Sequence, residues 1–186
     1  TNNKRCLEIS KRYIDAILSS QDEDGYFGPR GLKNVKGKNG QVVCDLYPHM
    51  IILSVFTDHF EYTEDQRVLP FMKEFFEFCG NLPEHMFIPL STEGNLGWGG
   101  GVYGSSRPFV QSIRAGDMLP HLFWYYNVTG DSTALTLARR FFRHIRPSWD
   151  EWLDHHAVNF PQRFAYSGVY YQLSHLDYHW DQVDYW

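Results

Sequence analysis

Apolar residues recur at helical spacing in several separate stretches of the chain. Between residues 5 and 20, apolar side chains fall three, four and seven positions apart, which is the period of one helix face. Gly25 follows soon after, as expected where a helix stops. The same reasoning predicts helices over residues 5–20, 46–62, 66–79, 113–128, 132–146 and 156–173.

No stretch sustains the alternation of apolar and polar residues that a half-buried strand requires. Residues 30–43 are rich in glycine and lysine, and they predict a loop. We therefore expect an all-α fold with short breaks, in a single helical domain that spans residues 1–186.

Two segments of the chain resemble each other at a constant offset. "HFEYTEDQRVLPFMKEFF" (59–76) aligns with "YYNVTGDSTALTLARRFF" (125–142), and each reads as an aromatic helix, a Thr-x-Asp turn and a second helix. We expect Asp65 and Asp131 to cap the second helix of each copy. Tyr170 and Tyr171, before "QLSHLD", look like the first helix of a further copy. Repeated helical hairpins indicate a solenoid or a closed ring.

Composition excludes several classes of function. The net charge is −5 and no long basic run occurs, so we do not expect nucleic-acid binding. No apolar run reaches about 18 residues, so no membrane span is expected. The three cysteines form no C-x-x-C pair, which indicates neither a disulfide framework nor a structural zinc site.

A long glycine-rich loop covers about residues 80–111 and contains Trp98. Loops of this length inside a compact domain are usually functional or disordered. The flat face of a tryptophan packs well on the C–H face of a sugar, and glycines let a loop close over a ligand. Trp98 is therefore a candidate stacking platform; the alternative is a loop tryptophan docked into the core.

Polar residues stand in pairs, three or four apart, at the starts of three predicted helices. The pairs are Asp45 with His49, Arg114 with Asp117, and His156 with Asn159. Side chains at this spacing share one helix face, and a carbohydrate site needs such groups because each buried sugar hydroxyl must be hydrogen-bonded. Simpler roles stay open: Asp45 as a cap, an Arg–Asp surface ion pair, and a solvated histidine.

Four segments, in this order, resemble a known family. They are "SSQDEDGYFGPR", "DLYPHMIILSVFTDHFEYTEDQRVLPFMKEFFEF", "RAGDMLPHLFWYYNVTGDSTALTLARRFFRHI" and "HHAVNFPQRFAYSGVYYQLS". Together they resemble the helical domain of β-L-arabinofuranosidase-like glycoside hydrolases, the family 127 group and its uncharacterised relatives. The resemblance implies an (α/α)6 toroid whose inner helices ring a sugar-binding funnel, with this chain as its first half to two-thirds.

The same resemblance implies a glycoside hydrolase that acts on a sugar such as an arabinofuranoside. Its substrate-binding residues here would be Asp45, His49, Trp98, Arg114, Asp117, His156 and Asn159. The catalytic residues stay unassigned, with Asp45 and Asp117 as the candidates, because the family places its acid/base Glu and its zinc-bound cysteines further along the chain. We expect no cofactor in this chain; zinc belongs to the full-length family enzyme.

Two alternatives to the hydrolase remain. One is a non-catalytic carbohydrate-binding or scaffold module on the same fold, and the other is a different α/α-toroid enzyme such as a polysaccharide lyase. The expected partner is a carbohydrate, with the remainder of its own toroid or a second chain as a protein partner. The compartment is open, and we place a secreted or periplasmic location ahead of the cytoplasm.

Overall fold

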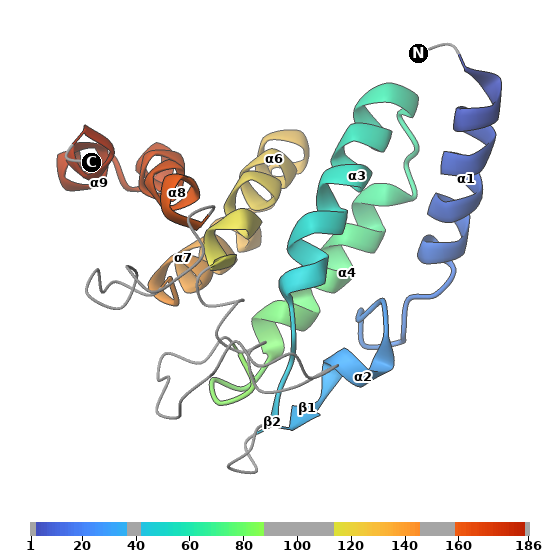
Figure 1. Cartoon of the computed structure of the whole chain (residues 1–186), viewed down its shortest axis with the longest axis horizontal. Helices are drawn as coiled ribbons and strands as arrows, with labels where there is room; N and C mark the ends of the chain where they lie inside the picture. The colour runs from blue at the N-terminus through green and yellow to red at the C-terminus, as the bar shows by residue number, and fades with distance from the viewer. Residues whose placement is uncertain (1–2, 37–41, 88–113, 146–158, 185–186) are drawn as a thin grey trace.

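The structure is a computed structural model that describes residues 3–36, 42–87, 114–145 and 159–184, with the backbone alone for 159–164. Within these ranges the chain is mostly helical, which confirms the all-α class (Figure 1). The helices are α1 (Lys4–Leu18), α2 (Arg30–Lys33), α3 (Tyr47–Thr63), α4 (Val68–Asn81), the 3-10 helix η1 (Ala115–Met118), α6 (Leu119–Thr129), α7 (Thr133–Arg143), α8 (Asn159–Ser174) and α9 (Asp177–Asp184).

The prediction of a loop over residues 30–43 needs correction. It contains α2 and two short strands, β1 (Val35–Lys36) and β2 (Val42–Val43), which pair antiparallel with Val35 opposite Val43. Proline is tolerated just before or at the first helical turn, so Pro29 permits a helix to begin at Arg30. Valine favours the extended conformation because its branched side chain fits a pleated surface.

The predicted helix at 113–128 begins as the 3-10 helix η1 rather than as an α-helix. Pro120 stands in the first turn of α6, where its missing N–H leaves no bond unmade. The regular α-helix therefore begins at Leu119, a few residues later than the apolar pattern indicates.

The helices form hairpins that stand side by side (Figure 1). Helices α3, α6 and α8 follow one another as neighbours, α4 packs against α7 behind them, and α1 lies at one edge with α8 and α9 at the other. Between α3 and α4, and between α6 and α7, lies a core rich in phenylalanine. The hairpin repeat expected from the sequence is therefore present in the described part of the chain.

The turns of the three hairpins share one geometry. Each first helix ends with a residue in the left-handed conformation, whose N–H donates to a carbonyl four residues earlier; these residues are Glu64, Gly130 and His175. Thr63, Thr129 and Ser174 precede them, and each hydroxyl accepts the N–H two residues further on. The third hairpin, α8–α9, thus continues the repeat.

Asp65 and Asp131 each accept a backbone N–H two residues further on, although the N-cap positions of α4 and α7 are held by Arg67 and Ser132 rather than by the aspartates as expected. The Asp65 carboxylate accepts the N–H of Arg67 at 3.1 Å, and the Asp131 carboxylate accepts the N–H of Thr133 at 3.0 Å. Both bonds supply a partner to an N–H at the start of the second helix, where the helix itself offers none.

Arg140 of α7 connects the second hairpin to the first. Its guanidinium donates to the backbone carbonyls of Cys79, Gly80 and Leu82 at 2.7–2.9 Å. These carbonyls lie at the end of α4, where the helix leaves them without N–H partners. A cation is also favoured there by the helix dipole, so Arg140 caps α4 from a neighbouring helix.

The stretch 21–28 inserts Phe27 between α3 and α4. The ring lies 4.8 Å from the His49 ring on α3, and 4.7 and 4.8 Å from the rings of Phe71 and Phe75 on α4 (centroid distances). Phe27 is buried. Gly25 packs closely against the backbone of Glu74. A Cβ at this position would come within 2.1 Å of the Glu74 carbonyl oxygen, so a larger residue would clash. The stretch is thus a wedge that only a glycine at this position allows.

Candidate functional site

A cleft of about 340 Å³ opens between α3, the start of α6 and α8. Its apolar wall comes from all three helices, and its polar side chains come from α3, η1 with the residue before it, α6 and α8. The lining residues are Met50, Ile51, Ser54, Arg114, Asp117, Pro120, His121, Ala165, Tyr166 and Val169.

Asp117 is the centre of the polar side of the cleft. One carboxylate oxygen accepts the Nε–H of Arg114 at 2.7 Å, and the other accepts the hydroxyl of Tyr166 at 2.6 Å. Arg114 and Asp117 are mostly buried, with side chains 13% and 20% exposed, so the pair differs from the exposed ion pair considered from the sequence. Charge-assisted bonds of this kind hold both oxygens in fixed directions.

Tyr166 approaches the 3-10 helix at Gly116. A Cβ at Gly116 would meet the Tyr166 ring at 2.1 Å, so any larger residue must displace the ring. Burial and the nearby Asp117 carboxylate raise the pKa of Tyr166 well above its ordinary value, so its hydroxyl keeps its proton and donates. The contact between α8 and η1 therefore depends on the absence of a side chain at Gly116.

His121 also lines the cleft. Its Nε2 lies 3.0 Å from the carbonyl oxygen of Met50, and a carbonyl only accepts, so Nε2 carries the hydrogen. Burial lowers the pKa of His121, which favours the neutral ring. The other nitrogen, Nδ1, then holds a lone pair that can accept a hydrogen bond from a hydroxyl group of a ligand.

Neither His121 nor Tyr166 was among the residues predicted from the sequence. A signal for His121 exists, because the motif Asp-x-x-Pro-His occurs twice, at residues 45–49 and 117–121. In both copies the histidine Nε2 donates to a backbone carbonyl of an earlier segment, Phe27 for His49 and Met50 for His121. For Tyr166 no spacing signal exists, since its partner Asp117 lies 49 residues away.

The predicted residues divide into those that line the cleft and those that do not. Arg114 and Asp117 lie together in it. Asp45 and His49 are buried, each 2% exposed, and lie outside the set that lines the cleft. The expected convergence of all these groups in one concavity is thus seen only for the Arg114–Asp117 pair among the described residues.

Asp45 and His49 have internal partners. The Asp45 carboxylate accepts the N–H of Tyr47, the first residue of α3, at 3.2 Å, while the N-cap position itself is held by Leu46. His49 donates from Nε2 to the carbonyl of Phe27 at 2.6 Å and stacks on Phe75 with ring planes 17° apart. Burial lowers the pKa of His49 to about 4, and the ring is neutral near pH 7.

The remaining predicted residues lie where the structure gives no side-chain position. Trp98 and His156 fall outside the described residues, and so does most of the glycine-rich loop expected at about 80–111. Asn159 begins α8, but its side chain is not among those described. Their roles stay predictions.

Within the described ranges, no group of three or more His, Cys, Asp and Glu side chains could hold a metal ion. None of the helices described is both long and apolar enough to cross a membrane. Comparison with family models, with curated proteins and with solved structures yields no match to the chain. The cleft itself is therefore the basis for any functional assignment.

Proposed function

We propose that the cleft around Asp117 binds one sugar residue of a carbohydrate, and that the chain is part of a glycoside hydrolase of the arabinofuranosidase-like type. The observation that carries the proposal is the Arg114–Asp117–Tyr166 cluster in the wall of a cleft with apolar residues opposite. In this proposal the hairpins belong to an (α/α)6-type toroid and the cleft to its funnel.

The chemistry of the cleft suits a sugar. Its volume, about 340 Å³, falls at the small end of ligand pockets, which suits one ring rather than a long chain. Asp117 and the Nδ1 of His121 can accept hydrogen bonds from hydroxyl groups, and Arg114 can donate them. Ile51, Pro120 and Val169 offer an apolar surface for the C–H face of the ring. A buried hydroxyl needs a hydrogen-bond partner, and Asp117, His121 and Arg114 can each supply one.

A second candidate function is sugar binding without hydrolysis. Hydrolysis by the usual route needs two carboxyl groups about 5–10 Å apart, one on each side of the scissile bond. Among the described residues that line the cleft, Asp117 is the only one with a carboxylate. This observation favours a binding role for this part of the chain.

Titration calorimetry with L-arabinose and an aryl L-arabinofuranoside tests the proposal. We expect weak binding that falls at least about tenfold in Tyr166→Phe, because the lost hydroxyl frees one oxygen of Asp117 from its fixed direction. Asp117→Asn should lose binding further, since it removes a charged acceptor. Tyr13→Phe, at an exposed position of α1, is the matched control and should bind as the parent chain does.

Two outcomes separate the two candidate functions. Release of the aryl group by the chain, abolished in Asp117→Asn, would place hydrolysis in this chain. Binding without release would support the binding role. Unchanged sugar affinity in both Tyr166→Phe and Asp117→Asn would contradict the proposed site altogether.

A further inference from the structure

The polar side of the cleft offers a ligand mainly hydrogen-bond acceptors. Ser54, neutral His121 and Tyr166 carry one polar hydrogen each, and each of these hydrogens is already donated within the protein. The acceptors are, in the same order, the carbonyl oxygen of Ile51 at 2.7 Å, the carbonyl oxygen of Met50 at 3.0 Å and the Asp117 carboxylate at 2.6 Å. The three groups therefore present lone pairs to a ligand.

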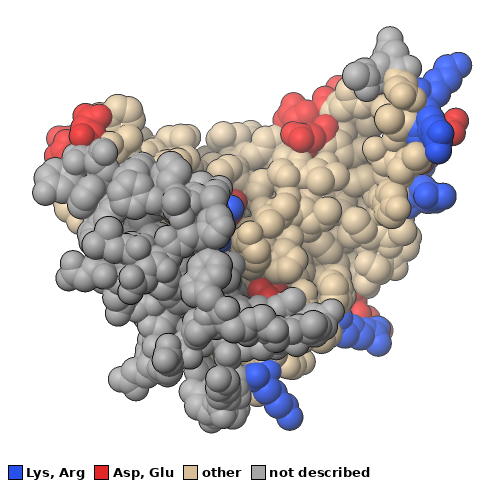
Figure 2. Space-filling view, viewed as in Figure 1, with Lys and Arg blue, Asp and Glu red and all other residues tan. Residues whose placement is uncertain are grey.

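Arg114 is the polar lining residue with further N–H groups, beyond the Nε–H that it donates to Asp117. Its charge is balanced by the Asp117 carboxylate at 2.7 Å. Figure 2 shows a broad surface over α3 with almost no charged side chains, and Ile51 of this helix is 51% exposed beside the cleft. The described lining residues thus carry no net charge when His121 is neutral, which suits an uncharged ligand.

Among the acceptors, His121 is the one that cannot change its role near pH 7. A hydroxyl group can rotate, so Ser54 and Tyr166 can donate to a ligand if they give up an internal bond. The bond from His121 Nε2 to Met50 of α3 holds the ring and its hydrogen in place, and burial lowers the pKa of His121. Its Nδ1 therefore only accepts.

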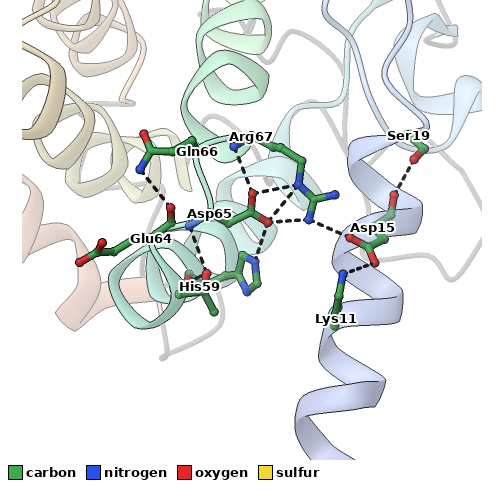
Figure 3. Close-up of polar contacts among 9 residues, drawn as sticks. Lys11, Asp15, Ser19, His59, Glu64, Asp65, Gln66 and Arg67 are labelled. Atoms are coloured by element: carbon green, nitrogen blue, oxygen red, sulfur yellow. Dashed lines mark hydrogen bonds and ion pairs between the residues drawn. The ribbon is translucent and has the colours of Figure 1, made fainter.

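Two other histidines on α3 lack this combination. His49 makes the same Nε2 bond and its Nδ1 has no partner among the described residues, but the side chain is buried, so a ligand cannot reach it. His59 lines a hollow of about 730 Å³ between α1 and α3. It lies 3.2 Å from the Asp65 carboxylate, which also binds Arg67, so these polar groups pair with one another (Figure 3).

We propose that His121 is a specificity-determining residue of the cleft, and that it selects an uncharged sugar with a hydroxyl donor at one particular position. The inference rests on the proposed function, because it takes the ligand to be a sugar. An analogue without that hydroxyl hydrogen leaves Nδ1 unpaired against the ligand, and an unpaired polar atom is costly there. A site that binds one hydroxyl in this way discriminates strongly against an analogue that lacks it.

Titration calorimetry at pH 7 tests this with methyl L-arabinofuranoside and its analogues in which fluorine replaces each hydroxyl in turn. Fluorine is close to a hydroxyl in size but cannot donate a hydrogen bond. One analogue should bind the parent chain at least about tenfold more weakly than the sugar does. In His121→Phe the same analogue and the sugar should bind alike, because the acceptor that distinguishes them is gone.

The pH dependence of binding is the second measurement. The pKa of His121 is lowered from 6.5, so the acceptor is present above that value and is lost as the pH falls through the lowered pKa, where Nδ1 gains a proton. Affinity for the sugar should fall with it. His121→Gln keeps an acceptor and a donor but does not titrate, so its affinity should change less. Other titratable or charged groups near the ring are the same in this variant: Asp58, Arg114, Asp117 and Tyr166.

The control is His85→Gln, at an exposed position after α4, which should keep the selectivity and the pH dependence of the parent chain. Circular dichroism shows that each variant is folded. Equal binding of the sugar and all its fluorinated analogues would overturn the proposal and leave sugar binding in place. So would selectivity that survives in His121→Phe, or a pH dependence that is unchanged in His121→Gln. A parent chain that binds none of these ligands would instead contradict the proposed function, and this inference with it.

Discussion

The α3–α4 and α6–α7 hairpins have the same turn but different interiors. At matched positions, α4 buries Val68, Phe71, Met72 and Phe75, whereas α7 buries Ala134, Leu137, Ala138 and Phe141. Helices α6 and α7 approach each other more closely than α3 and α4 do. Small side chains permit this, because the distance between two packed helices follows the size of the residues at their contact.

The wider hairpin is wide because it holds a third element. Phe27 enters between α3 and α4, and His49 closes over it with a bond from Nε2 to its carbonyl. In the narrower hairpin, Ala134 and Ala138 occupy positions where α4 has Val68 and Met72. The two hairpins thus share a turn, and the segment inserted between α3 and α4 accounts for their difference in width.

The largest effect is expected from removing the wedge. Phe27→Ala should lower the free energy of unfolding by about 3–5 kcal/mol, because it leaves a cavity between two helices that cannot easily close. Urea unfolding followed by circular dichroism measures the change. Tyr13→Ala, at an exposed site, should change stability by less than about 0.5 kcal/mol. A loss below about 1 kcal/mol for Phe27→Ala would mean that the hairpin collapses without its wedge.

The histidines of the two Asp-x-x-Pro-His motifs, His49 and His121, should differ in how much they change the free energy of unfolding at low pH. His49 has a folded pKa of about 4 against an ordinary value of 6.5, so the unfolded chain binds more protons between these values. Its neutral form contributes stability that is fully present above about pH 6.5 and is lost as the pH falls toward 4. His49→Gln keeps a donor for Phe27 and should flatten this fall.

His121→Gln is the comparison, because the pKa of His121 is also lowered by burial, but its ring lies at the edge of a cleft. Urea unfolding at pH 7, 6, 5 and 4 measures both slopes. We expect the loss for the parent chain to be on the order of 3 kcal/mol from His49 over this range. Equal slopes for the parent chain and His49→Gln would show that His49 does not titrate in this window.

The smallest effect concerns the turns themselves. Glu64 and Gly130 hold the same left-handed position, with φ of 54° and 73°. A residue with a Cβ is strained there and glycine is not, so Glu64→Gly should raise the free energy of unfolding by about 0.5–1 kcal/mol. Gly130→Ala should lower it by about 1 kcal/mol. Thermal unfolding of both variants measures the changes, and shifts of the same sign would contradict the equivalence of the two turns.

The cleft and the wedge show where reasoning from the sequence stops. The Arg114–Asp117 pair is local, three residues apart, and its spacing was enough to predict it. His49 was predicted to point into a funnel and lies instead against Phe27, 22 residues earlier. The helical periodicity of apolar residues predicts which face of a helix is buried. It does not predict which other segment of the chain covers that face.

The sequence by itself predicted the longer helices, the pairing of α3 with α4 and of α6 with α7, and the Thr-x-Asp turns of these two hairpins; α2, α9 and the two short strands were not predicted. The predicted features rest on hydrogen bonds between residues two to four apart, such as those of Thr63, Asp65 and their counterparts, and on helical periodicity. Only the tertiary structure decided the spacing of the helices and the contact of Tyr166 with Asp117. Those contacts join residues far apart in the chain, and they form because Gly25 and Gly116 leave room for another segment to approach. A glycine in the sequence permits such a close approach, but it does not show which distant segment of the chain will pack against it.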